Sequence, residues 1–117
     1  MHVAVRRPLP ALLLAAVAFA VLSCGDSTAP NEETVQVKDD FFNPISASIQ
    51  AGGTVTWQWG GSNQHNVTWV TQSGTSNSPT QVTGTYTRNF SGAGTYDYYC
   101  TIHGTPTSGM RGSVAVQ

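Results

Sequence analysis

Residues 52–59 read Gly-Gly-Thr-Val-Thr-Trp-Gln-Trp, and their polar and apolar side chains alternate with a period of two. Successive side chains of an extended strand point to opposite faces, so Val55, Trp57 and Trp59 would share one face and polar residues the other. The stretch therefore predicts a β-strand with one apolar face, beginning at a pair of glycines.

The same alternation recurs before and after this strand. Glycine pairs and the Asp39-Asp40 pair are expected to turn the chain between runs, and residues 71–80 have the composition of a long loop. No stretch after residue 24 has helical periodicity. Seven or eight short strands in about 85 residues predict an all-β fold, a Greek-key β-sandwich. The further strand candidates are residues 34–38, 45–49, 65–70, 81–90, 94–100 and 111–117.

The beginning of the chain has a different character. Two arginines precede an apolar run at residues 12–22, which has the length of a signal peptide and is short for a bilayer span. The run ends at Val21-Leu22-Ser23-Cys24, which resembles a bacterial lipobox. We expect residues 1–23 to be a lipoprotein signal peptide and Cys24 to carry the lipid. The alternative is an ordinary signal peptide cut near Ser23, which would leave Cys24 as a free thiol.

Residues 24–33 are polar and have almost nothing to bury, so we expect a flexible tether there and a folded domain at residues 34–117. The protein would then be exported and held by its lipid at the periplasmic or extracytoplasmic face of a bacterial membrane.

Without Arg6 and Arg7 the chain keeps three basic and six acidic residues. This mildly acidic composition excludes a basic surface for nucleic acid.

Few side chains in the expected mature domain can bind a soft metal ion. With residues 1–24 set aside, its histidine, cysteine and methionine residues are His65, Cys100, His103 and Met110. The last three lie within eleven consecutive positions, and His65 begins a strand far away in the sequence. A lone thiol such as that of Cys100, outside the cytoplasm, tends to oxidise unless it is buried or bound to a metal.

A thiolate, two imidazoles and a thioether form a donor set suited to one copper ion that alternates between Cu(I) and Cu(II). Four protein ligands leave no open position for a substrate, so the pattern favours an electron carrier over an enzyme. Each residue also has a simpler interpretation: His65 as a hydrogen-bonded strand end, Cys100 as core, His103 as surface and Met110 as a strand starter. Their joint occurrence in this order favours the metal site.

Five segments carry a resemblance to known proteins: GGTVTWQW (52–59), HNVTWV (65–70), GTYDYYC (94–100), CTIHG (100–104) and GMRGSVAV (109–116). With these segments the sequence resembles cupredoxins of the plastocyanin, pseudoazurin and halocyanin type. This resemblance implies an eight-stranded Greek-key sandwich with a type 1 (blue) copper centre that carries single electrons. We expect a monomer that meets redox protein donors and acceptors transiently.

The resemblance also implies roles for individual residues. The backbone of Asn66 would help to order the site near the thiolate. His103 would be the partly exposed ligand through which electrons leave, and Tyr99 would point away from the core and line a second docking patch. Six residues separate His103 from Met110, more than in most plastocyanin-type loops, so residues 105–108 include an apparent insertion.

Three other functions are compatible with parts of this pattern. A copper-binding protein that stores or delivers metal would need exposed, exchangeable ligands, often rich in Met or His, and this chain has none to spare. An accessory module of a larger oxidase or reductase system would share the same site. A metal-free or zinc-binding adhesive sandwich would leave Cys100 and Met110 unexplained.

Overall fold

The computed structural model describes residues 28–71 and 74–117. The expected signal peptide and the expected lipidation site, Cys24, lie outside these residues. The described part forms eight strands and no α-helix. Accordingly, no helix in that part is long and apolar enough to cross a membrane.

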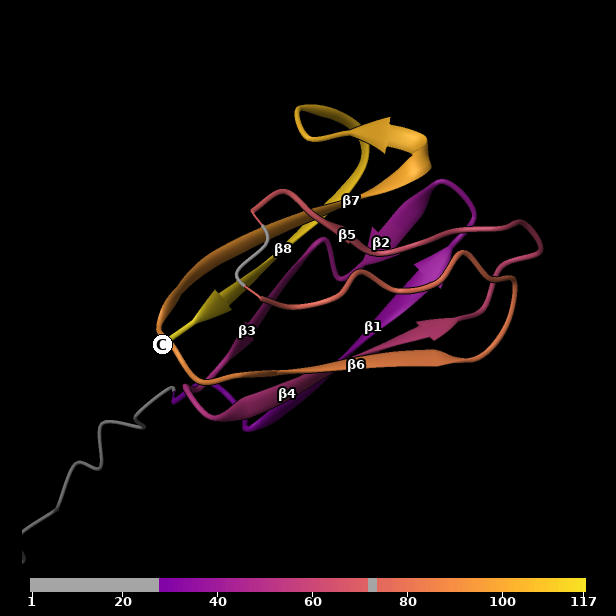
Figure 1. The fold of residues 1–117 in the computed structure, drawn as a ribbon. Coiled ribbons are helices and arrows are strands. Elements are labelled where there is room, and N and C mark those ends of the chain that lie inside the picture. Colours follow the sequence, from indigo (N-terminus) through magenta and orange to yellow (C-terminus); the bar gives the residue numbers. More distant parts are fainter. Residues whose placement is uncertain (1–27, 72–73) are drawn as a thin grey trace, which may run out of the picture.

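The strands form two four-stranded sheets packed face to face (Figure 1). In spatial order, the first sheet contains β2 (Phe41–Asn43), β1 (Glu32–Lys38), β4 (Gly53–Trp59) and β6 (Thr85–Phe90). The second contains β3 (Ser46–Ile49), β8 (Ser108–Val116), β7 (Gly94–Thr105) and β5 (Thr68–Trp69). Strands β1 and β4 pair in parallel, as do β3 and β8, and the other pairs are antiparallel. The predicted all-β sandwich is confirmed.

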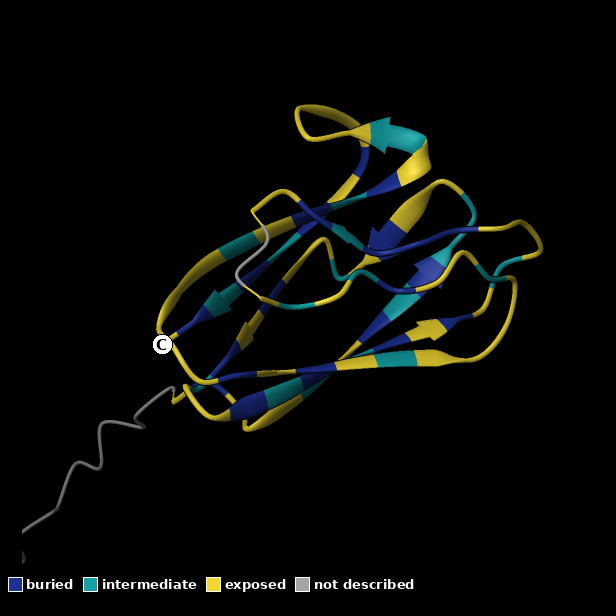
Figure 2. Cartoon of the chain, in the orientation of Figure 1, coloured by how far each residue is buried: buried dark blue, intermediate teal, exposed yellow. Residues whose placement is uncertain are grey.

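The hydrophobic core lies between the sheets, where the buried faces of the strands meet (Figure 2). On β4 the predicted apolar face is buried: Val55 and Trp57 have no exposed surface, and Trp59 is also buried. The Trp57 ring makes edge-to-face contacts with Trp69 and Tyr98 of the second sheet, at centroid distances of 5.5 and 5.3 Å. Aromatic rings favour this arrangement because the positive edge of one ring meets the negative face of the other. These contacts join the two sheets.

Most strand boundaries differ from the predicted ones: β5 covers only Thr68–Trp69 of the predicted 65–70, and β6 begins at Thr85 within the predicted 81–90. Strand β1 begins at Glu32, which pairs with Thr54, so the sandwich includes part of the expected tether. Further back, Ala29 is buried and the Pro30 carbonyl accepts a hydrogen bond from Gln50 N–H. The polar composition of this segment did not indicate a strand, because its backbone is ordered by partners that are remote in the sequence. Ile45, predicted to be part of the β3 strand, precedes it and is 69% exposed.

The β7–β8 hairpin extends further than the sequence predicted. Tyr99 pairs with Arg111, but the next pair is Gly104 with Gly109, so the register shifts between them. The segment 100–103 therefore bulges out opposite the single residue Met110. Beyond the bulge, Thr105 pairs with Ser108 and the chain turns. The apparent insertion thus forms the tip of the hairpin, seen at the top of Figure 1. Because Gly104 pairs with Gly109, the inserted residues do not separate His103 from Met110 in space.

Candidate metal centre

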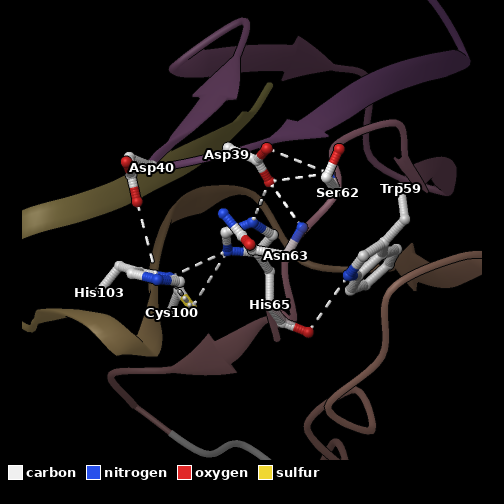
Figure 3. A network of polar contacts seen from close by, with 8 residues as sticks. All are labelled: Asp39, Asp40, Trp59, Ser62, Asn63, His65, Cys100 and His103. Atoms are coloured by element: carbon white, nitrogen blue, oxygen red, sulfur yellow. Dashed lines mark hydrogen bonds and ion pairs between the residues drawn. The ribbon is translucent and has the colours of Figure 1, made fainter.

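The structure brings three of the predicted donor atoms together at one end of the sandwich (Figure 3). His65 Nδ1 and His103 Nδ1 lie 3.1 Å apart. Cys100 Sγ lies 3.8 Å from His65 Nδ1 and 3.7 Å from His103 Nδ1. The cluster therefore has two nitrogens and one sulfur facing a common point.

These separations fit one metal ion. Bonds of about 2.0 Å to nitrogen and about 2.3 Å to sulfur, in a flat three-ligand arrangement, would place the nitrogens about 3.5 Å apart and each nitrogen about 3.7 Å from the sulfur. The separations in the protein match these values to within a few tenths of an ångström. Two imidazoles and a thiolate in this arrangement are the planar donors that favour copper.

His65 is held in place by backbone hydrogen bonds to Gln81 and by a side-chain hydrogen bond from Trp59. It lies between β4 and β5 and forms an isolated bridge with Gln81, in which each backbone N–H donates to the other residue's carbonyl at 3.0 Å. The Trp59 indole N–H also donates to the His65 carbonyl, at 3.2 Å. His65 has no exposed surface. The His65 imidazole therefore has a fixed place and is itself closed to solvent.

Cys100 lies on the inner face of β7, two residues after the buried Tyr98, and it has no exposed surface. His103 lies three residues further along β7, where the strand bulges, and its side chain is 27% exposed. The bulge is what allows both side chains to reach the same point, because residues 100 and 103 would otherwise face opposite sides of a regular strand. His103 is the donor that reaches the protein surface.

Met110 is buried, and the register of the hairpin places it opposite the bulge that contains Cys100 and His103. Gly104 and Gly109 allow this close approach. A Cβ atom on Gly104 would lie 2.7 Å from both the N and O atoms of Met110. Gly109 has a φ of 77°, in the left-handed region that favours glycine. Met110, the predicted thioether donor, thus lies on β8 opposite the part of β7 that carries Cys100 and His103.

Asn66, the residue after His65, connects the His65 segment to the residue after Cys100 through its side chain. Its Oδ1 accepts the Thr101 backbone N–H at 3.0 Å, and its Nδ2 donates to Thr101 Oγ1 at 2.7 Å and to Thr80 Oγ1 at 3.0 Å. The sequence prediction assigned an ordering role to the Asn66 backbone, whereas these contacts come from the amide group. Tyr99 alternates with the buried Tyr98 and Cys100 and is half-buried on the outer side of β7.

Two acidic residues at the site, Asp39 and Asp40, were not predicted from the sequence. Asp39 Oδ1 lies 3.0 Å from His65 Nε2, and Asp40 Oδ1 lies 3.7 Å from His103 Nε2. Hydrogen bonding to His65, and then to the backbone N–H groups of Asn63 and Ser62, lowers the pKa of Asp39 to about 2. The sequence indicated only a turn at these positions. Nothing in it relates that turn to a histidine 26 residues away.

The fold and the donor cluster together define a class of protein. The chain belongs to the plastocyanin/azurin family of copper-binding proteins, which it matches over residues 31–117. The resemblance to cupredoxins is therefore confirmed, and the cofactor is copper.

Individual relatives support this assignment. Plastocyanin from Scenedesmus fuscus is 31% identical over 86 residues, which cover 65% of this chain and 86% of the relative. Among solved structures, a purple cupredoxin from Nitrosopumilus maritimus has 28% identity and a TM-score of 0.61, covering 73% of this chain and 99% of the other. The reduced Cu(I) form of an amicyanin variant has 30% identity and a TM-score of 0.63, covering 78% and 87% of the two chains.

Proposed function

We propose that this protein carries single electrons at a type 1 copper centre whose ligands are His65, Cys100, His103 and Met110. The observation that carries the proposal is the convergence of three donor atoms, from His65, Cys100 and His103, within 4.8 Å of one another. Copper bound there would supply a one-electron couple between Cu(I) and Cu(II).

The protein's own residues are suited to this task. The side chains of His65 and Cys100 are fully buried. The His65 backbone is bonded to Gln81, and Cys100 directly follows Tyr99, which pairs with both β5 and β8, so both side chains have little freedom to move. Donors that stay in place when the charge of the ion changes keep the structural rearrangement small, which favours rapid electron transfer. Met110 would complete the donor set as a weak axial ligand. The closed set leaves no position for a substrate, which supports a carrier over an enzyme.

His103 offers the route between this buried centre and a partner. Its side chain is part-exposed, and its neighbour Ile102 is 49% exposed. A partly exposed ligand shortens the path from metal to protein surface, and an apolar neighbour is easily desolvated when a partner docks. We propose transient redox proteins as the donors and acceptors at this surface, with Tyr99 on the outer side of β7 as a second contact.

A metal-delivery or accessory role for the same site is the second candidate. Delivery requires ligands that exchange readily with a partner, and two of the three clustered donors, His65 and Cys100, are completely buried. This burial favours a resident ion.

We further propose that residues 1–23 are a lipoprotein signal peptide and that the mature protein is anchored through Cys24 outside the cytoplasm. The apolar run at 12–22, which ends in Ser23-Cys24, supports this proposal. In such a compartment an unpaired thiol benefits from burial and metal binding, and Cys100 is buried in the metal-binding cluster.

The decisive experiment is the visible spectrum of the mature exported protein loaded with Cu(II). We expect one copper per chain and an intense Cys-to-copper band toward the red, lost on reduction and restored by one equivalent of oxidant. A protein that binds copper without an intense visible band, or whose colour does not respond to reductant, would contradict the electron-carrier proposal.

A further inference from the structure

Two adjacent carboxylates approach the two histidine rings at Nε2, whereas Cys100 Sγ lies near Nδ1 of both rings (Figure 3). Lys38 pairs with Phe41, so Asp39 and Asp40 alone form the turn between β1 and β2. Asp39 contacts His65 Nε2, and Asp40 faces His103 Nε2. The donor atoms of both imidazoles are the other ring nitrogens, Nδ1. One two-residue turn therefore contacts the back of both candidate ligands.

We propose that Asp39 and Asp40 are positioning residues of the copper centre. Asp39 orients the His65 imidazole with Nδ1 toward the ion, and the negative charges of Asp39 and Asp40 favour the oxidised ion over the reduced one. This inference rests on the proposed function and adds to it two residues that set the properties of the centre.

The orienting effect of Asp39 follows from hydrogen-bond chemistry. An ionised carboxylate can only accept hydrogen bonds, so at 3.0 Å the Nε2 atom of His65 carries the proton. A neutral imidazole with its proton on Nε2 has its lone pair on Nδ1, which is the atom that faces Cys100 Sγ and His103. The contact thus selects the tautomer that can bind metal before any metal arrives.

Asp39 is itself held in place by the loop that follows β4. Its Oδ1 accepts the backbone N–H groups of Ser62 at 3.0 Å and Asn63 at 2.9 Å. Gly61 lies so close that a Cβ atom there would overlap Asp39 Oδ1. The loop that leads from β4 to His65 therefore fixes the carboxylate that orients His65.

Asp40 makes a weaker and more exposed contact. At 3.7 Å its carboxylate is beyond a direct hydrogen bond to His103, and the side chain is 74% exposed. Its backbone has a φ of 69°, a conformation that glycine adopts without cost. Asp is among the few other residues that adopt this conformation in tight turns. Solvent and salt screen its charge, so its effect should be smaller than that of Asp39 and should shrink at high ionic strength.

The orienting effect can be tested without copper. Nitrogen NMR of the metal-free protein should show His65 as a single tautomer protonated on Nε2. Asp39→Asn keeps an oxygen at Oδ1 and should keep that tautomer, whereas Asp39→Ala removes the acceptor and should give a mixture. If folded Asp39→Ala retains the single Nε2–H tautomer, Asp39 does not orient His65. If Asp39→Ala does not fold, the test passes to Asp39→Asn, and a change of its tautomer or the loss of its blue band overturns the proposed geometry.

The charge effect is tested by reduction potentials of copper-loaded Asp39→Asn and Asp40→Asn. Both potentials should rise. For Asp39→Asn we expect about a tenfold change in the preference for Cu(I) over Cu(II), which corresponds to about 59 mV for one electron. The rise in Asp40→Asn should be smaller and should decrease as salt is added.

Glu32→Gln is the matched control, because it removes one charge from the far end of β1, about 23 Å from Asp39 along an extended chain. Potentials of the Asp variants that equal that of Glu32→Gln would overturn the charge effect. Failure of the two proposals can be told apart. A parent protein with no blue band contradicts the copper-carrier function, whereas a blue parent whose Asp variants match the control contradicts only this inference.

Discussion

The amide group of Asn66 is joined to Thr101 by two hydrogen bonds, accepting its backbone N–H at 3.0 Å and donating to its hydroxyl at 2.7 Å. Asn66 directly follows His65, and Thr101 directly follows Cys100. The two bonds therefore hold together the two chain segments that supply the buried donors. The spacing of the donors depends on this connection as well as on the strands themselves.

We predict that Asn66→Ala lowers the free energy of unfolding by about 1–3 kcal/mol, because it removes a buried amide and leaves the part-buried Thr101 N–H without its partner. The visible band of the copper form should also shift, since the sulfur and the nitrogens are no longer held at the same spacing. Denaturant titration and absorption spectra measure the two effects. Asn89→Ala is the control: it removes hydrogen bonds to Gly52 and Gly53 and should leave the spectrum unchanged.

Cys100→Ser should abolish the blue colour and the redox response while the sandwich stays folded. Serine has nearly the shape of cysteine and fits the same buried position, but its hydroxyl cannot provide the thiolate donor. Circular dichroism should match the parent, and the visible band should be absent. An intense band in the serine variant would show that copper binds elsewhere.

Met110→Leu should keep a type 1 spectrum with an altered reduction potential, whereas His65→Ala should weaken or lose the site. A thioether is a weak axial ligand that tunes the ion, and the imidazole belongs to the strong plane. The exchange of Met for Leu conserves volume and should cost less than about 1.5 kcal/mol of stability. If Met110→Leu has the potential and spectrum of the parent, the fourth position is not occupied by Met110.

Gly104→Ala should destabilise the protein by about 1–3 kcal/mol, because its Cβ would meet the backbone of Met110, which cannot move without opening the hairpin. The reduction potential should change with it, since the same backbone carries the proposed axial ligand. Gly92→Ala is a suitable control, because its Cβ would come near only Tyr96 Oη, at the end of a side chain. Equal stability losses in the two variants would argue against a special role for the hairpin contact.

Cys24→Ser should move the protein from the membrane fraction to the soluble exported fraction without changing copper binding. The prediction follows from the apolar run that ends at Ser23-Cys24. Fractionation and the mass of the mature N-terminus measure it. Membrane association that persists in the variant, with no lipid mass on the parent, would rule out the lipid anchor.

Much of the fold could be predicted because burial imposes a period of two on each strand. The alternation at Val55, Trp57 and Trp59 is the buried face of β4, and the pattern around Tyr98 and Cys100 is that of β7. The start of β1 at Glu32 was not predictable in this way, because a polar strand end is ordered by backbone bonds to Thr54 and its neighbours. Such partners depend on topology and leave no mark in the local composition.

For the metal centre, too, some features could be predicted from the sequence and others depended on the tertiary structure. The sequence alone determined which side chains could supply its donors, since soft ligands are scarce after residue 24 and His65, Cys100, His103 and Met110 are the available set there. Only the tertiary structure decided that the inserted residues close into a hairpin tip and leave Met110 opposite the bulge. It alone also placed Asp39 and Asp40 behind the imidazoles. A turn residue carries no sequence signal for the group it will face, because that contact is set by how two sheets pack and not by the residues next to it.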